Sequence, residues 1–489
     1  MGIVLKEHTK GKITVKVSEN DTDGNFCEET VSVVFSRETF EYVKKTEPRK
    51  FKREKNKDYH CFQINSKNDE ILLEPNYFVG IDWICEEKAR YIQVEPKVNS
   101  GVIASFDAII SEEREHITEE EIKKIDEKAE QLVKNDEYRW EVDYISMLME
   151  IMSHVDVAQH TDHLLLIDWE ASEISITQEQ DRLTPFLIVR FLKLLQNIVK
   201  KGLKKSYYKV EENLRSKVKG KILVEKQIKQ NIFRNRFSNT VCTYEVFGED
   251  SIENKFLKKV FVFCLQYIEN NMLYFENKKN ISWIINYIRP AFDHVSNKVN
   301  VQDTKHLKYN PFFKEYKDAI KLGQQILKRF SYNITKTTDK IISTPPFWID
   351  MPKMFELYVY AQFLKDNPDL SAGNFNYQFS TYGNSLDFLI GTEKEKWVVD
   401  TKYKLHYNYG QIHNDIRQVA GYARLKTVKE KSPEAIREEI PCLIIYPKPL
   451  AANEKINLSI AYLLAMKEEI KAYHHVYKLG ISLPVIKKQ

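Results

Sequence analysis

The sequence predicts a multidomain α+β protein, with a β-rich N-terminal domain, a mainly helical middle region and a C-terminal α/β domain. Three observations support this prediction. The chain has 489 residues, which is longer than one typical domain. Short apolar runs separated by polar turns fill the first hundred residues, whereas long segments with helical periodicity fill the middle. Near the C-terminus, two apolar runs carry ionisable residues where a strand normally has none.

The first predicted domain covers residues 1–105 and the middle region covers 106–335. Strand signals in the first domain lie at 13–17, 31–35 and 89–98. The acidic segment 111–128 contains Thr118 and Glu121 at the spacing of a capping box, so we expect a solvated connecting helix there. Apolar residues with helical periodicity then occupy 185–199 and 253–274.

Composition excludes several classes of protein. Hydrophobic content of 43%, with 27 tyrosines and 26 phenylalanines, is typical of a folded chain. No apolar stretch approaches the roughly 20 residues that span a bilayer, and the N-terminus is charged too early for a signal peptide, so we expect a cytoplasmic protein. The six cysteines are scattered without a C-x-x-C pair, which supports neither a zinc ribbon nor a disulfide framework.

Positive charge is concentrated between residues 200 and 236, although the net charge of the chain is only +4. The residues proposed to contact DNA phosphates are Lys204, Lys205, Arg215, Lys219, Lys221, Arg234 and Arg236. Such contacts would be independent of base sequence and sensitive to salt. A solvated helical face explains the same stretch equally well.

The two C-terminal strands place acids beside a lysine. Period-two alternation along 397–403 puts Asp400 and Lys402 on the same face. The segment between the two runs is polar and begins with glycine, so we expect a hairpin that brings Asp387 near Asp400. Adjacent carboxylates repel one another unless a cation lies between them. From the D-x-K triplet alone a salt-bridged hairpin is the favoured interpretation, and the flanking segments reverse that preference.

One helix before the hairpin and one after it add candidate residues. Asp350 is a good N-cap for a largely apolar helix whose body carries one acid, Glu356. A buried carboxylate is costly unless it is paired or bound to metal, although a partly exposed glutamate fits equally well. After the hairpin, Gln418 and Tyr422 lie one turn apart on a predicted helix, which ordinary amphipathicity also explains.

Together these segments resemble the PD-(D/E)xK nuclease superfamily, in the branch with a Q-x-x-x-Y motif. Leu386 stands where the superfamily name has proline. The resemblance implies an α-β-β-β-α-β core with a mixed central sheet in residues 336–489, and the run 441–447 supplies the last strand.

The resemblance also implies a role for each matching residue. Asp387 and Asp400 would bind Mg²⁺ or Mn²⁺, ions that suit carboxylate oxygens and that activate water on a phosphodiester. The Thr401 carbonyl and Glu356 would be further ligands. Lys402 would be the catalytic lysine, with Glu356, Gln418 and Tyr422 as auxiliary residues of the site.

Motifs in the middle region narrow the resemblance. Four segments are similar to the G-x-x-x-x-Y, E-N-L, x-G-x-I and x-N-x-x-L-K stations of the McrC family, the nuclease subunits of McrBC-type modification-dependent restriction systems: 202–208, 211–214, 219–222 and 253–258. The segment 95–98 is similar to the P-K-I strand of that family. LlaJI-type restriction subunits look similar as well.

This resemblance implies a DNA endonuclease subunit of a GTP-dependent system with a AAA+ McrB-like GTPase as partner. The subunit would dock through residues 1 to about 150, stimulate GTP hydrolysis and cut DNA. The chain has no G-x-x-x-x-G-K-[S/T] or G-x-G-x-x-G motif, so we expect GTP to be bound by the partner. Two alternatives stay open: a non-catalytic DNA-binding or GTPase-activating adaptor, and a stand-alone repair exonuclease of the same fold.

Overall fold

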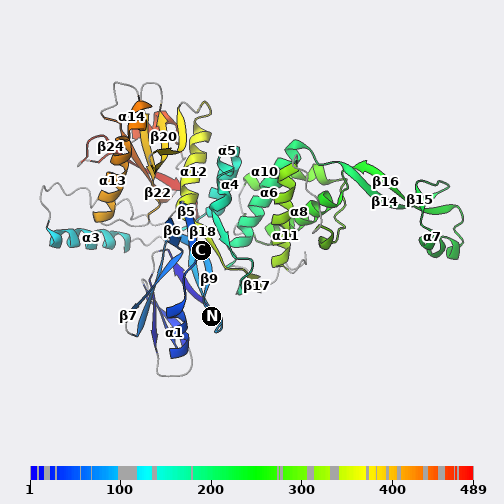
Figure 1. The fold of residues 1–489 in the computed structure, drawn as a ribbon, viewed down its shortest axis with the longest axis horizontal. Coiled ribbons are helices and arrows are strands. Elements are labelled where there is room, and N and C mark those ends of the chain that lie inside the picture. Colours follow the sequence, from blue (N-terminus) through cyan, green and yellow to red (C-terminus); the bar gives the residue numbers. More distant parts are fainter. Residues whose placement is uncertain are drawn as a thin grey trace. The chain divides into compact units, whose positions relative to one another are not determined.

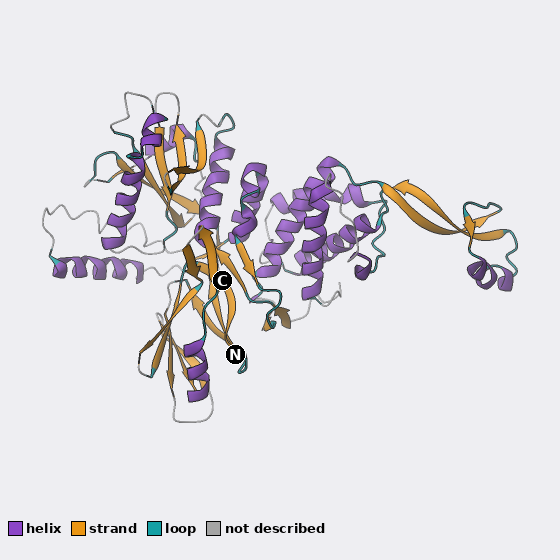
Figure 2. Cartoon of the chain, viewed as in Figure 1, coloured by secondary structure: helices purple, strands orange, loops and turns teal. Residues whose placement is uncertain are grey.

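A computed structural model provides the structure of the chain. It describes residues 2–7, 10–15, 22–27, 30–54, 57–67, 69–96, 118–134, 140–177, 180–271, 275, 279–304, 313–330, 341–370, 374–381, 383–391, 396–404, 409–432, 439–449, 457–466, 468–470 and 473–487. Helices and several mixed sheets occur together, so the predicted mixture of α and β structure is confirmed (Figure 2). None of the helices described is long and apolar enough to cross a bilayer.

Contacts divide the chain into two compact units. The first unit consists of Met1–Ile174 together with Pro345–Gln489, and the second consists of Ser175–Thr344. The β-rich segment and the C-terminal α/β segment therefore belong to one unit, although they are distant in sequence.

Two five-stranded sheets build the N-terminal part of the first unit (Figure 1). One has the order β1 (Gly2–Lys6), β10 (Arg90–Glu95), β9 (Phe78–Cys85), β18 (Phe347–Asp350), β12 (Leu165–Ile167). The other has the order β3 (Thr22–Cys27), β4 (Thr30–Phe35), β2 (Lys10–Val15), β8 (Glu70–Pro75), β7 (Phe62–Lys67). Helix α1 (Arg37–Lys45) and the ribbon of β5 (Lys50–Glu54) and β6 (Lys57–His60) complete this part. The three predicted strand segments are confirmed as β2, β4 and β10.

The pairing of β9 with β18 joins the N-terminal strands to the C-terminal part of the unit. Gly80 pairs with Trp348, and a Cβ atom at Gly80 would lie 2.0 Å from the Phe347 carbonyl oxygen. Only glycine therefore allows the strands to approach this closely. β18 ends at Asp350, whose side chain accepts the Lys353 backbone N–H at 2.9 Å and caps the next helix, as predicted.

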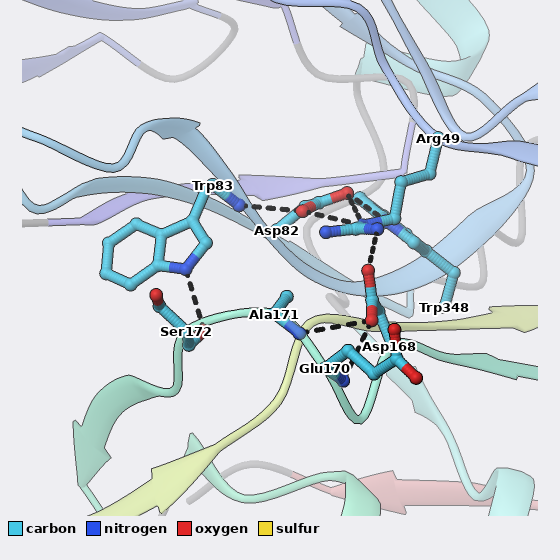
Figure 3. Close-up of polar contacts among 8 residues, drawn as sticks. All are labelled: Arg49, Asp82, Trp83, Asp168, Glu170, Ala171, Ser172 and Trp348. Atoms are coloured by element: carbon cyan, nitrogen blue, oxygen red, sulfur yellow. Dashed lines mark hydrogen bonds and ion pairs between the residues drawn. The ribbon is translucent and has the colours of Figure 1, made fainter.

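A partly buried group of polar residues fastens the same strands to the segment that follows β12 (Figure 3). Arg49 Nε lies 2.9 Å from Asp82 Oδ2, and its NH1 lies 2.5 Å from Asp168 Oδ2. The Trp348 indole N–H donates to Asp82 Oδ2 at 3.1 Å. Burial raises the pKa of Asp82 against the opposing effect of Arg49, so the ion pair is needed to keep this carboxylate charged.

The C-terminal part of the first unit is built on a six-stranded sheet. Its order is β19 (Phe375–Thr381), β20 (Asn384–Gly391), β21 (Lys396–Thr401), β22 (Cys442–Pro449), β24 (Val476–Leu483), β23 (Glu468–Glu469). β21, β22 and β24 are parallel, whereas the other neighbours are antiparallel, so the sheet is mixed. Helix α12 (Met351–Asp366) precedes the sheet and α13 (Tyr409–Ala423) lies between β21 and β22 in sequence.

Shorter elements complete the first unit. They are α3 (Glu119–Lys134), β11 (Trp140–Val142), α4 (Tyr144–Ser153), α5 (Val155–Ala158), η1 (Thr161–His163), α14 (Lys426–Glu430), α15 (Ile460–Met466) and β25 (Val485–Lys487). Thr118 and Glu121 form the predicted capping box at the start of α3. Ile125 of α3 is buried in the core of the C-terminal sheet, so this helix is not solvated on all sides; residues 111–117 lie outside the described part.

The second unit is a group of helices with one long hairpin. Its elements are β13 (Ile174–Thr177), α6 (Leu183–Lys201), η3 (Ile232–Arg234), α8 (Ile252–Asn270), α10 (Lys279–Ile288), η4 (Arg289–Phe292), η5 (Val301–Thr304), α11 (Lys314–Arg329) and β17 (Ile341–Thr344), with the hairpin described below. A buried ion pair of 2.9 Å joins Arg329 to Asp181, which also caps α6 through the Thr184 N–H. The predicted helices at 185–199 and 253–274 correspond to α6 and α8.

The hairpin forms an arm (residues 204–249) that projects from these helices (Figure 1). β14 (Ser206–Arg215) pairs with β16 (Asn239–Gly248) over ten residues, and β15 (Lys221–Ile222) and α7 (Val224–Gln230) lie at the far end. At the root, the Asn254 amide donates to the Lys204 and Glu249 carbonyl oxygens at 2.9 and 2.7 Å. Asn254, the asparagine of the x-N-x-x-L-K motif, thus ties together the first and last residues of the arm at its root.

Candidate active site

The two acidic strands form the expected hairpin. β20 and β21 are antiparallel, with Phe388 opposite Val399, and the turn 392–395 lies outside the described residues. Asp387 Oδ2 accepts hydrogen bonds from the backbone N–H and the hydroxyl of Thr401, at 2.7 and 2.6 Å. The pairing therefore brings Asp387 to the end of β21, where Asp400 is 3% exposed.

Lys402 connects the second acid to helix α13. Its Nζ lies 2.7 Å from Asp400 Oδ2 and donates to Gln418 Oε1 at 2.9 Å. The Gln418 amide in turn donates to the Tyr422 hydroxyl at 2.7 Å. Gln418, itself bonded to the tyrosine one helical turn on, thus holds the lysine just after the C-terminal end of β21. The contact of Gln418 with Lys402, and of Tyr422 with Gln418, is a structural finding, whereas the auxiliary role of both residues stays a prediction.

Glu356 lies on the first half of α12 and is held by three neighbours. Lys353 Nζ lies 2.9 Å from Glu356 Oε1, and the Gln378 amide donates to the same oxygen at 3.2 Å. Lys353 also donates to the Tyr377 hydroxyl at 2.6 Å. The carboxylate is 14% exposed, so it is a mostly buried acid with its own lysine.

Burial and mutual repulsion dominate the electrostatics of these acids. The pKa of Asp387 is raised well above its usual range, chiefly by burial and then by the charges of Asp400 and Glu356. Burial also raises the pKa of Asp400, although Lys402 opposes it. Burial lowers the pKa of Lys402, but the charge of Asp400 outweighs this and the net shift is upward, so the lysine stays protonated.

Carboxylate oxygens are ligands that suit a hard divalent cation. Three mostly buried carboxylates oppose one another, and a cation would offset that repulsion. In this structure Lys402 pairs with Asp400 and Lys353 pairs with Glu356, whereas Asp387 accepts hydrogen bonds from Thr401. The described residues that do place three ligand atoms within 4.8 Å of one another are Glu439, His474 and His475, which lie elsewhere on the unit. A His475–Glu439 ion pair of 3.1 Å accounts for that surface group.

Several residues next to the site were not predicted. Lys353 and Tyr377 contact Glu356 or its lysine, and the spacing of Lys353 three residues before Glu356 was an available signal. Asp415 of α13 pairs with Lys404 at 2.5 Å, one turn before Gln418. No local pattern predicts these contacts as functional.

The basic stretch lies mostly on the arm, and several of its charges are paired. Lys204 pairs with Glu253 at 2.6 Å, and Lys205 lies 3.5 Å from Glu249. Lys219 lies 4.1 Å from the centre of the Tyr244 ring. The remaining candidates are exposed: Arg215, Lys221, Arg234 and Arg236. DNA contact by these residues stays a prediction.

The fold and the site define a class: a multidomain α/β protein with an acidic, lysine-containing centre on a mixed sheet. A model of the McrBC 5-methylcytosine restriction system component family matches residues 84–447, more than half of the chain. The chain belongs to this family, so the assignment predicted from its motifs is confirmed.

Two solved structures are similar to the chain. One is a chain of the refined half-complex from the tetradecameric assembly of Thermococcus gammatolerans McrB AAA+ hexamers with bound McrC, with 11% identity and a TM-score of 0.36 over 98% of this chain and 94% of the other. The second is a chain of the cryo-EM structure of the Thermococcus gammatolerans McrBC complex, with 12% identity and a TM-score of 0.27 over 76% and 89%. No curated protein matches the chain.

Proposed function

We propose that this chain is the DNA-cleaving subunit of its restriction system, a metal-dependent endonuclease that hydrolyses phosphodiesters. The observation that carries the proposal is the juxtaposition of Asp387 and Asp400 on paired strands, with Lys402 held beside them by Gln418. Membership of the McrBC family supports it independently, because that family consists of restriction system components.

The acids and the lysine of the proposed site have different chemical roles. Asp387 and Asp400, with Glu356, would hold Mg²⁺ or Mn²⁺, which when bound polarises the phosphodiester and lowers the pKa of water. Lys402 offers a fixed ammonium beside the attacking water and offsets charge that develops on the phosphate. The water oxygen bonds to phosphorus, the bond from phosphorus to the 3′ oxygen breaks, and a 5′ phosphate and a 3′ hydroxyl result.

Substitution of the three central residues tests this proposal. Asp387→Ala, Asp400→Ala and Lys402→Ala are each expected to abolish cleavage while the circular dichroism spectrum stays unchanged. Glu356→Ala is expected to have a milder effect. Cleavage by purified Asp400→Ala protein at the wild-type rate would refute the site.

We also propose that the chain acts with a AAA+ GTPase that binds GTP and that the chain stimulates. The docking role is assigned first to residues 1 to about 150. Capture of the AAA+ protein encoded beside this chain tests it: a folded variant that lacks those residues and still binds undiminished would sink this assignment.

We propose that the tip of the arm is a second docking surface for the same partner. Phe233 and Phe237 are 77% and 74% exposed there, and Val224 is 65% exposed. Exposed apolar side chains at the end of a projecting arm are typical of a protein contact. A Phe233→Ser/Phe237→Ser variant is expected to lose capture of the partner and retain Mn²⁺ binding; capture at the wild-type level would exclude the tip.

Two other functions remain to be separated by assay. A non-catalytic adaptor would bind DNA or activate the GTPase without a divalent ion of its own, so a Mg²⁺ titration of the purified chain distinguishes it. A stand-alone repair exonuclease would digest DNA ends without GTP or a partner. The presence of Asp387, Asp400 and Lys402 together in one contact network favours the endonuclease over the adaptor.

A further inference from the structure

A second lysine of the proposed nuclease site has no part in the mechanism above. Lys402 pairs with Asp400, and Lys353 pairs with Glu356 in the same way, at 2.7 and 2.9 Å. The two lysine side chains are similarly buried, with exposed fractions of 16% and 17%. Buried ammonium groups are uncommon unless they have a partner, so each lysine neutralises one acid in this structure.

The ammonium of Lys353 retains one donor for a ligand. It has three N–H donors, and Glu356 Oε1 and the Tyr377 hydroxyl accept two of them. No other described residue lies within hydrogen-bonding distance of the third. Tyr377 also places the centre of its ring 5.2 Å from the ammonium, a cation–π contact.

Glu356 would keep a partner if Lys353 turned to another group. The Gln378 amide donates to Glu356 Oε1 at 3.2 Å. Gln378 has a φ of 48°, a left-handed conformation that a residue with a side chain rarely adopts. It lies where the pairing of β19 with β20 passes from Tyr377–Phe388 to Phe379–Leu386, across from Asp387. Such strain gathers at functional sites, where the surroundings hold it in place.

We propose that Lys353 is a second catalytic cation, which binds a non-bridging oxygen of the scissile phosphate while Glu356 turns to the divalent ion. The inference rests on the nuclease function proposed above. A phosphodiester brings negative charge to a site already lined by three acids, and a second fixed cation beside Glu356 would offset part of that charge. An ammonium suits this position because it is a compact charge with rotatable donors.

Full-length protein with Lys353→Met, Lys353→Arg and the control Lys365→Met tests the proposal. Lys365 lies on the same helix, is 52% exposed and pairs with Glu150. Three measurements are compared: Mn²⁺ affinity by calorimetry without DNA, DNA affinity by anisotropy in Ca²⁺ at several salt concentrations, and kcat and KM for cleavage in Mg²⁺.

Lys353→Met is expected to bind Mn²⁺ at least as tightly as wild type, because Glu356 is released. Its DNA affinity should fall with a salt slope smaller by about 1, as for one lost phosphate contact. Its kcat should fall roughly 100- to 1,000-fold, the effect of removing one donor to a transition state. Lys353→Arg should regain DNA affinity, and Lys365→Met should match wild type.

Two results would overturn the proposal. Weaker Mn²⁺ binding with unchanged DNA affinity would make Lys353 only a support for Glu356. Unchanged kcat and salt slope would leave it without a role. If Lys353→Met does not fold, Lys353→Gln replaces it, since the amide still donates to Glu356. A wild-type protein that neither binds Mn²⁺ nor cleaves would instead refute the nuclease function itself.

Discussion

The Tyr403 hydroxyl donates a hydrogen bond of 3.1 Å to the Glu7 carboxylate, and both side chains are buried. Glu7 follows the first strand of the chain, whereas Tyr403 directly follows Lys402. The contact therefore fastens the N-terminal sheets to the segment that carries the proposed catalytic lysine.

Removal of the hydroxyl should weaken the first unit. Tyr403→Phe is expected to lower the free energy of unfolding by about 1–3 kcal/mol, because a buried carboxylate loses a hydrogen bond. Urea denaturation measures this, with Tyr207→Phe, a 72% exposed tyrosine, as the control. Equal midpoints for the two variants would show that the bond adds nothing to stability.

The glutamine of α13 should affect turnover more than stability. Gln418→Ala removes an acceptor from Lys402, and loss of about 1.5–3 kcal/mol from a hydrogen bond to a charged group corresponds to a fall in kcat of roughly 10- to 100-fold. KM for DNA should change little, and Gln418→Glu should retain more activity. The matched control is Asn414→Ala on an exposed position of the same helix. If the two alanine variants cleave at the same rate, Gln418 does not position the lysine.

Local patterns predicted the pieces of the site, and their long-range partners were not predictable in the same way. Alternation placed Asp400 and Lys402 on one face, and the polar turn predicted the pairing that brings Asp387 close. Contacts such as Glu7–Tyr403 join residues that are far apart in sequence, and the periodicity of a single segment does not predict them. The pairing of β9 with β18 is of the same kind, since only the close approach at Gly80 hints at it.

The arm shows a similar limit. The E-N-L and x-N-x-x-L-K motifs indicated the family, but the hydrogen bonds that their asparagines form are known only from the structure. Asn213 and Asn231 exchange amide hydrogen bonds of 2.9 Å near the tip, while Asn254 clamps the root. In the structure this basic stretch contains strands β14 and β15 as well as helix α7. The solvated helical face considered from the sequence is therefore wrong for β14.

Asn254 should be a critical residue for the second unit. It is fully buried, donates to two carbonyl oxygens and accepts from the Tyr316 hydroxyl at 2.8 Å. Asn254→Ala is expected to cost about 1–3 kcal/mol of stability, because buried carbonyl oxygens lose their donor. Tyr316→Phe removes one bond of the same network, so the double variant should be less destabilised than the sum of the single variants. Additive effects in urea denaturation would contradict this coupling.

Metal-free stability should depend on Asp387 and on pH. The raised pKa of Asp387, caused by burial and by the charges of Asp400 and Glu356, means that the folded state binds its proton more strongly than the unfolded state. The stability that this proton contributes is complete below the ordinary aspartate pKa of about 3.9 and is lost as pH rises through the raised pKa. In EDTA at neutral pH, Asp387→Asn should therefore melt at a higher temperature than wild type, and the gap should narrow as pH falls.

Mg²⁺ should raise the Tm of wild type and leave that of Asp387→Asn nearly unchanged, because an ion that binds only the folded state stabilises it. Thermal melts at several pH values, with the exposed Asp369→Asn as control, measure both effects. A wild-type Tm that does not respond to Mg²⁺ would count against the proposed metal site.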